Sequence, residues 1–214
     1  MPQIFISHLE IMPSSIKNLA TLLPHNIQWA NYFNNENPVD LEIGTGRTHF
    51  LFERALNFPE RNIVGVEWKF QFVEQANRRI IREGIPNVAA FHGNAWLLIP
   101  LLFAPNSIAQ VFVNFPDPWW KMRHKKRLVL NEPFLDALAQ RMRQDGFLVI
   151  QTDVRELLEA YGSLIKNHGA FKPDLLTDQQ AITTKLKAKS HREKKCLSQA
   201  LPIFRQIFYK KPAL

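Results

Sequence analysis

From residue 39 onward, short apolar runs alternate with amphipathic stretches, and this alternation limits the possible folds more than any other feature. The runs at 39–43, 63–67, 88–92, 108–115 and 147–152 are too short and too apolar to be surface helices. Strands that alternate with helices are typical of a parallel sheet covered on both faces. The pattern predicts an α/β fold with a doubly wound, mostly parallel sheet, joined late by an antiparallel C-terminal strand at 203–209.

Two of the stretches between these runs have the apolar period of a helix. Phe70, Val73, Ala76 and Ile80 share one face of the first. In the second helix, Leu135, Leu138 and Met142 share one face. Asn131 is expected to cap the start of this helix and Gly146 to follow its end. Residues 1–37 have a mixed composition that becomes rich in Asn and Pro toward the end of the segment. This predicts an N-terminal extension with a short helix around 15–23, followed by a single domain at 38–214.

Composition excludes several classes of protein. The single cysteine, Cys196, cannot form an intrachain disulfide, and no Cys and His lie at the spacing of a zinc site, so no metal is expected. No apolar run approaches the roughly 20 residues that cross a bilayer, and no basic start precedes an apolar core, so we expect no membrane association and a cytoplasmic location. The net charge of +8 favours a polyanionic partner.

A glycine turn follows the first predicted strand. Gly44 and Gly46 allow a tight passage from strand to helix and the close approach of a ligand. Glu67 ends the second strand about 20 residues later, where a carboxylate can accept both hydroxyls of a ribose. Together they indicate an adenosine-type cofactor, although a purely structural turn and a solvated strand-end acid are the simpler alternatives.

The residues around this turn separate two cofactor classes. A dinucleotide requires a third glycine and a helix N-terminus open to pyrophosphate, whereas Thr48 stands at the third position and Glu42 lies just before the turn. An acid there suits an ammonium group, so S-adenosylmethionine is favoured over NAD. Asn94, after the third strand, is expected to contact adenine, to cap the next helix, or to do both.

The fourth strand runs into the segment NFPDPWWKMRHKKR. Pro116 and Pro118 stiffen its exit and hold Asp117 at the edge of the sheet, beside the expected sulfonium. Trp119 offers a face on which a base can stack, and the cations that follow can track phosphates; they include Lys121, Arg123 and His124. A turn acid, core tryptophans and a solvated basic face are the alternatives, but the order of these residues favours nucleic-acid binding.

The motifs LEIGTG, GVE, NFPDPWWKMRHKKR, QTD at 151–153 and TKLK at 184–187 resemble, in this order, those of the bacterial tRNA (guanine-N7)-methyltransferases. The resemblance covers residues 38 to the C-terminus and implies a class I, Rossmann-like methyltransferase domain that methylates N7 of a guanosine in tRNA, as a monomer or homodimer. It implies cofactor contacts at Glu42, Gly44, Glu67 and Asn94, a catalytic-site acid at Asp117, and substrate contacts at Lys121, Asp153, Thr184 and Lys185. With Glu156, Asp153 also has the spacing of a capping box.

Four positions depart from the family pattern. Thr48 replaces a glycine, Asn94 an aspartate and Trp120 a histidine, while Lys187 replaces the glutamate that closes a T-x-[FY]-E motif. The last change reverses a charge expected beside the guanine, which leaves open a relative that methylates another substrate or an RNA-binding protein with little methyl transfer. The cations at 185–195 are expected to form either a second phosphate-contacting strip, partly extended, or a solvated basic tail.

Overall fold

The computed structural model describes residues 26–117, 129–174 and 179–212, without the side chains of 179–181. A single seven-stranded sheet runs through it in the order β3-β2-β1-β4-β5-β7-β6. The strands are β1 (Val39–Ile43), β2 (Asn62–Glu67), β3 (Val88–His92), β4 (Ile108–Asn114), β5 (Met142–Thr152), β6 (Phe171–Pro173) and β7 (Phe204–Lys210). The first five are parallel, and β7 pairs antiparallel with both β5 and β6. The predicted fold class is confirmed.

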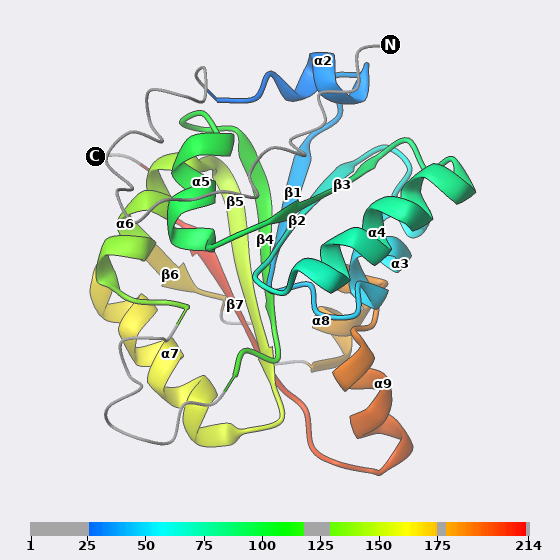
Figure 1. The fold of residues 1–214 in the computed structure, drawn as a ribbon. Coiled ribbons are helices and arrows are strands. Elements are labelled where there is room, and N and C mark those ends of the chain that lie inside the picture. The colour runs from blue at the N-terminus through cyan, green and yellow to red at the C-terminus, as the bar shows by residue number, and fades with distance from the viewer. Residues whose placement is uncertain (1–25, 118–128, 175–178, 213–214) are drawn as a thin grey trace, which may run out of the picture.

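Helices cover both faces of the sheet, as Figure 1 shows. One layer contains α3 (His49–Asn57), α4 (Phe70–Glu83), α8 (Gln179–Leu186) and α9 (His191–Ser198). The other contains α2 (Trp29–Phe33), α5 (Ala95–Leu102), α6 (Glu132–Arg141) and α7 (Arg155–His168). Because each face is covered, alternate residues of β2, β4 and β5 enter two separate apolar clusters, which explains why these strands have largely continuous apolar runs. In β1 one face is apolar and the other carries the buried acids Asp40 and Glu42.

The predicted elements agree with the structure except at particular ends. β5 begins at Met142, so α6 stops at Arg141 and Gly146 lies inside the strand instead of following the helix. Asn131 caps α6 as predicted, since its side chain accepts a hydrogen bond from the N–H of Phe134 at 3.0 Å. On α4 the predicted apolar face is wrong at one position, because Phe70 is 55% exposed.

The N-terminal extension is described only in part. The helix predicted around 15–23 lies outside the described residues, whereas α2, which the sequence did not indicate, packs Trp29 and Phe33 into the core beside Phe103. The boundary at residue 38 stays a prediction, but the last part of the extension contributes to the apolar core. No helix among the described residues is long and apolar enough to cross a membrane.

Candidate functional site

The order of the strands reverses between β1 and β4, and in open α/β sheets ligands bind beyond the carboxyl ends of the strands at such a point. β1 leaves the sheet there through Gly44 and Gly46, with φ angles of 76° and 50° that favour glycine. A Cβ on Gly65 of β2 would lie 2.5 Å from Cγ2 of Thr45, so the turn packs directly on the neighbouring strand. The glycine turn is therefore fixed by φ at two residues and by close packing at a third.

Glu67 holds this turn in place from the end of β2. One carboxylate oxygen accepts a hydrogen bond from the N–H of Gly46 at 2.7 Å, and the other accepts one from the N–H of Lys69 at 2.8 Å. The side chain is buried, so the alternative of a solvated strand-end acid is wrong. Each oxygen keeps a second lone pair, which is the acceptor that a ribose hydroxyl requires.

Glu42 lies beside this turn as a buried acid with an incomplete set of partners. Its Oε1 accepts a hydrogen bond from Nδ2 of Asn114 at 3.0 Å. Within the described part of the chain, Oε2 of Glu42, Oδ1 of Asn114 and Oγ1 of Thr45 are buried without a hydrogen-bond partner. Burial raises the pKa of Glu42 to about 8. The hydrogen bond from Asn114 lowers this pKa in part, and the charge of Glu67 raises it slightly further.

Three unpaired polar atoms at one point of the edge are costly unless a ligand completes their hydrogen bonds. The amide oxygen of Asn114 and an ionised Glu42 only accept hydrogen bonds, while the hydroxyl of Thr45 can also accept, so the ligand group that fits them carries donors, as an ammonium does. Asn114 was not assigned a role from the sequence. The sequence could nevertheless have indicated it, because Asn114 is a polar residue at the end of a mostly apolar strand, next to the point where the strand order reverses.

Thr48, which replaces the third glycine, adopts a left-handed conformation with φ of 61°. This is the region that glycine occupies without steric cost, so the chain keeps the backbone of the glycine pattern with a residue that is strained in it. Asn94 caps α5, because its side-chain oxygen accepts from the N–H of Trp96 at 2.9 Å. Its capping role is confirmed, and its contact with a cofactor stays a prediction.

Aromatic residues lie next to the ends of β2 and β3. Trp68 is 69% exposed, its carbonyl oxygen lies 3.0 Å from Nε2 of His92, and the ring of Phe70 packs edge-on against the His92 ring. The sequence did not single out Trp68, although it follows directly after Glu67. Trp68 and Phe70 are thus exposed aromatic residues directly after Glu67, and His92 lies two residues before the cap of α5.

Asp117 is exposed where the chain leaves β4, after Phe115 at a φ of 49°. The N–H of Phe115 donates to the carbonyl of Gln151 at 2.6 Å, so the exits of β4 and β5 run together. Asp153 follows β5 and therefore lies at the same edge of the sheet as Asp117. Four predicted substrate residues lie outside the described residues; they are Trp119, Lys121, Arg123 and His124.

Asp153 is bound by α9 rather than by the helix that follows it. Arg192 donates to Oδ2 of Asp153 from Nε, at 3.1 Å, and from its terminal amino group. The capping box proposed for Asp153 and Glu156 is wrong, because α7 has Val154 at its N-cap position without a side-chain hydrogen bond. The sequence prediction overlooked this partner, which lies 39 residues away along the chain.

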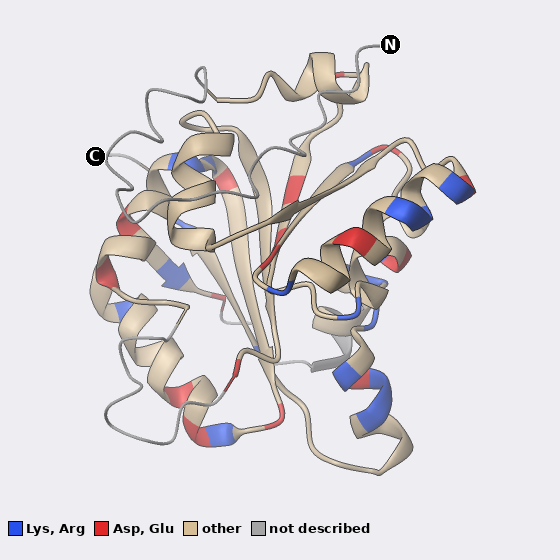
Figure 2. Cartoon of the chain, viewed as in Figure 1, with Lys and Arg blue, Asp and Glu red and all other residues tan. Residues whose placement is uncertain are grey.

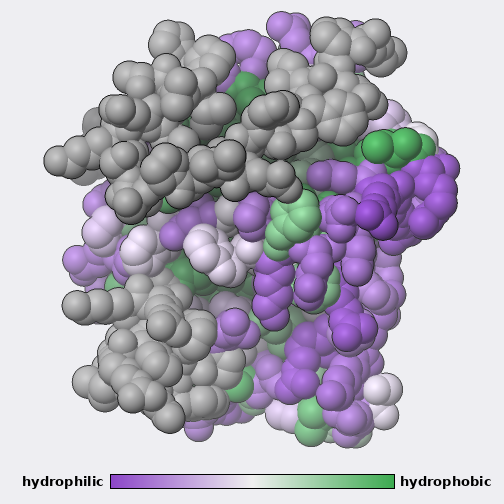
Figure 3. All heavy atoms as spheres, viewed as in Figure 1, coloured by the Kyte–Doolittle hydropathy of each residue, from purple (hydrophilic) through white to green (hydrophobic). Residues whose placement is uncertain are grey.

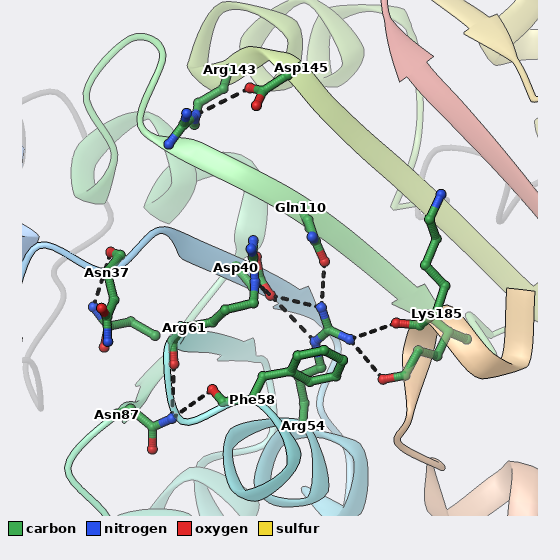
Figure 4. Close-up of polar contacts among 12 residues, drawn as sticks. Asn37, Asp40, Arg54, Phe58, Arg61, Asn87, Gln110, Arg143, Asp145 and Lys185 are labelled. Atoms are coloured by element: carbon green, nitrogen blue, oxygen red, sulfur yellow. Dashed lines mark hydrogen bonds and ion pairs between the residues drawn. The ribbon is translucent and has the colours of Figure 1, made fainter.

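Two other predicted substrate residues lie on α8. Nζ of Lys185 donates to the hydroxyl of Tyr209 at 2.6 Å and lies over the ring of Phe147. Phe147 and Tyr209 are paired in the row of the sheet that also contains Asp40 and Gln110, near the starts of the parallel strands. Lys185 therefore lies at the opposite end from the glycine turn, and Figure 4 shows its carbonyl oxygen bound by Arg54. Thr184 is exposed on the same helix.

Lys187 does not bring a positive charge to the carboxyl edge. Its ammonium group lies 5.4 Å from the centre of the Phe58 ring, at the end of α3. A buried acid of α9, Glu193, is hydrogen-bonded to the end of β5: it accepts from Gln151 at 2.8 Å and from Arg205 of β7 at 2.7 Å. Glu193 also stands three residues after Ser190, whose hydroxyl caps α9 by accepting from the Glu193 N–H at 3.1 Å. A serine followed three residues later by a glutamate is the pattern of a capping box, so the sequence could have indicated the start of α9.

The basic segment at 185–195 contains the end of α8, a non-helical connection at 187–190 and the first part of α9, so the extended conformation predicted from residue 185 is wrong where α8 continues to Leu186. The predicted alternation is present, since Lys185, Lys187 and Lys189 are exposed and the residues between them are buried, and a contact with phosphates stays a prediction. A cavity of about 400 Å³ opens beside it, between α8, α9 and the start of β7. Its lining mixes charged and apolar side chains: Thr183, Lys189, Glu193, Leu197, Leu201, Ile203 and Arg205. The surface over α4 and α9 is largely hydrophilic, with isolated hydrophobic spots (Figure 3).

Known proteins similar to this chain include a methyltransferase family and individual tRNA methyltransferases. The model of a methyltransferase family matches residues 36–206. A tRNA (guanine-N(7)-)-methyltransferase of Oceanobacillus iheyensis is 30% identical over 83% of this chain and 83% of its own. One of Thermosynechococcus vestitus is 33% identical over 80% of this chain and 79% of its own.

Among solved structures, the 16S rRNA methyltransferase KamB superposes with a TM-score of 0.63 at 13% identity, over 88% of this chain and 96% of its own. The aminoglycoside resistance methyltransferase NpmB1 superposes with a TM-score of 0.58 at 16% identity, over 85% and 91% of the two chains. At these identities the likeness concerns the fold alone.

Proposed function

The chain belongs to the tRNA (guanine-N7)-methyltransferase family, and from this membership we propose that it transfers a methyl group from S-adenosylmethionine to N7 of a guanosine in tRNA. The observation that carries the proposal beyond the family is the group of buried acceptors around Glu42 and Asn114. These atoms lie at the point of the sheet where a class I fold binds its ligand. They can accept hydrogen bonds, but no described residue donates to them.

The residues at this edge fit S-adenosylmethionine, which supplies the methyl group when it is bound. Glu42 and Asn114 would accept from the ammonium of its methionine part, and Glu67 from the ribose hydroxyls. Gly44 and Gly46 leave room around the turn, because a Cβ on either would meet no atom within 4 Å. Asn94 and the exposed ring of Trp68 would contact adenine, which has one edge for hydrogen bonds and two faces for packing.

The transfer asks for positioning more than for proton chemistry. N7 of guanine already has a lone pair, so no base is needed to remove a proton from it, and positive charge passes to the purine during the transfer. Groups that align the two reactants and stabilise this charge are sufficient. Asp117, exposed at the exit of β4, would orient the guanine or stabilise the cationic ring.

The target guanosine is expected in a loop or splayed from its stack. In A-form RNA the major groove, where N7 lies, is too deep and narrow for side chains to enter. Asp153 is placed to accept from the N–H groups of the base, while Trp119, Lys121, Arg123 and His124 would hold the neighbouring nucleotides. Because Lys187 lies away from this edge, the charge reversal that favoured a diverged function loses its structural basis.

Transfer of labelled methyl from S-adenosylmethionine to tRNA that lacks 7-methylguanosine tests the proposal, with nucleoside analysis of the digested product. We expect 7-methylguanosine as the only labelled nucleoside, and none with tRNA that already carries the modification. Label in another nucleoside, or bound cofactor without transfer to any tRNA, would contradict it.

A further inference from the structure

Arg192 is the described residue that contacts the acid at the end of β5. Its side chain is 42% exposed, and that of Asp153 is 19% exposed. Both of its hydrogen bonds go to Oδ2 of Asp153, so Oδ1 lies outside this pair. A guanidinium is planar and rigid, so two bonds to one carboxylate oxygen restrict the orientation of the whole carboxylate.

The helix that presents Arg192 is anchored on both sides. Next to it, Glu193 is buried and accepts from Arg205 of β7 and from Gln151 of β5, while Nε of Arg205 donates to Oε1 of Gln151 at 2.5 Å. These three side chains form a closed triangle between α9 and the carboxyl end of β5. Because every member is hydrogen-bonded to the other two, the triangle fixes the position of α9 against the strand that ends at Asp153.

A second contact fixes α9 against α3. Glu53 of α3 accepts from the N–H of Lys189 at 2.8 Å and forms an ion pair with Lys194. α3 begins directly after the glycine turn, so the helix of Arg192 is connected to the cofactor edge as well as to β5. The guanidinium is thus a fixed partner rather than a mobile surface cation.

We propose that Arg192 is a positioning residue, which holds the carboxylate of Asp153 so that it accepts from the N–H edge of the target base. The inference rests on the substrate role given to Asp153 under the proposed function. A guanine offers an N1–H and an amino group as neighbouring donors, and a carboxylate accepts from both only in one plane. Arg192 acts through Asp153 and does not contact the base itself.

The competing role for Arg192 is a direct contact with an RNA phosphate. The two roles differ in the effect of the double variant, because residues that act through one another are not additive. They also differ in salt dependence, since each phosphate contact contributes about −0.7 to −0.9 to the slope of log affinity against log salt. Arg192→Met, Asp153→Asn and the double variant would be compared in kcat and KM for tRNA and in the binding of both substrates.

We expect Arg192→Met to lower kcat/KM for tRNA about tenfold, with the affinity for S-adenosylmethionine within about twofold of the parent. The double variant should be no worse than Asp153→Asn alone, the salt slope of tRNA binding should be unchanged, and Arg192→Lys should recover part of the loss. Multiplied effects in the double variant, a salt slope reduced by about one phosphate, or unchanged kinetics would each overturn the inference.

Two controls separate this role from a loss of folding or of surface charge. Melting temperatures of all variants test the fold, and Arg192→Lys keeps the charge if Arg192→Met is unstable. Arg143→Met removes an exposed Arg–Asp pair with Asp145 near the start of β5 and should leave the kinetics unchanged. If the parent chain itself transfers no methyl group, the proposed function has failed; if only the Arg192 comparison fails, the positioning role has failed.

Discussion

At the scale of single residues, the acid at Glu42 combines full burial with one hydrogen bond and no cation beside it among the described residues. Such a group favours its protonated form, and its pKa of about 8 is consistent with this environment. A cationic ligand reverses the preference, because it stabilises the carboxylate. The free site therefore holds a proton near neutral pH that a bound ammonium displaces.

The affinity for S-adenosylmethionine should consequently rise as the pH increases through about 8, with a proton released on binding below that pH. Titration calorimetry in buffers of different ionisation enthalpy measures both effects. Glu42→Gln should lower the affinity about tenfold and remove the pH dependence, whereas Glu74→Gln, an exposed acid of α4, should change neither. A pH-independent affinity in the parent would show that Glu42 is already ionised.

Glu42 should also make the stability of the ligand-free chain depend on pH. The folded state holds a proton that the unfolded chain loses above its ordinary pKa of 4.5, so stability should fall as the pH rises from about 4.5 to about 8. Glu42→Gln cannot ionise, and its melting temperature should exceed that of the parent at pH 8.5. A lower melting temperature at that pH would indicate that the Glu42 carboxylate is stabilising.

Asp117 should affect turnover without affecting the fold. In the proposed role, Asp117 stabilises the developing cation, so we expect Asp117→Asn to lower kcat about a hundredfold. The melting temperature should not change, since the side chain is exposed. Single-turnover methyl transfer measures the step directly. Asp145→Asn, an exposed acid of β5 away from this edge, is the matched control. Equal turnover in parent and Asp117→Asn would exclude the role.

Single residues could be predicted where position along one element was sufficient. Glu42, Glu67 and Asp117 each lie at or just beyond the end of an apolar run, and the sequence placed all three at the same edge. Arg192 could not be found in this way, because its contact with Asp153 depends on how α9 packs against the sheet. Local spacing does not determine contacts across 39 residues.

At the scale of elements, the strands were predictable because both faces of the sheet are covered and the apolar runs are continuous. The errors fall where local signals compete. Gly146 was assigned to the end of a helix, but at that point β5 has already paired with β4 through Met142. The alternating cations of 185–189 suggested an extended segment, but α8 continues to Leu186. Ser190 and Glu193 had the spacing of a capping box, and they begin a second helix.

Asn94 has two roles that its substitutions can separate. Asn94→Ala should cost about 1 kcal/mol of unfolding free energy through the lost cap of α5 and should also weaken S-adenosylmethionine binding. Asn94→Asp keeps the cap and adds a favourable charge at the helix N-terminus, so it should retain both properties. Asn131→Ala removes the cap of α6 and should reduce stability alone. If Asn94→Ala binds the cofactor like the parent, Asn94 is only a cap.

At the scale of the whole molecule, the two ends of the sheet serve different purposes. The carboxyl end carries the glycine turn with the buried acids Glu42 and Glu67 and the exposed Asp117. The other end carries a buried ionic network that joins α3, β1, β4 and α8 (Figure 4). Positions of Lys, Arg, Asp and Glu are distributed along the outer helices, and those of Lys and Arg are grouped on α9 (Figure 2). The carboxyl end could be predicted from the order of the strands along the chain. The ionic network at the other end could not, because it depends on how α8 packs against the sheet.

The network is centred on Arg54, the largest fully buried side chain among the described residues. It forms an ion pair with Asp40 at 3.3 Å and donates to Gln110 at 2.5 Å and to the carbonyl of Leu186 at 2.8 Å. Asp40 is also bound by Arg61, and burial nevertheless raises its pKa above the ordinary value. Arg54 therefore fastens the end of α8, and the turn that leads into α9, to the sheet.

Arg54→Met should lower the free energy of unfolding by about 3 kcal/mol, because it leaves a buried acid with one cation and two carbonyls without donors. The loss should be smaller at pH 5 than at pH 8, since Asp40, whose pKa is already raised, can take up a proton when Arg54 is absent. Urea unfolding at the two pH values measures both effects. Arg78→Met breaks an exposed pair with Glu74 on α4 and should cost less than about 0.5 kcal/mol. A loss for Arg54→Met no larger than this control, or one that does not depend on pH, would mean that α8 is held by its apolar contacts and that the buried guanidinium does not determine where α9 lies.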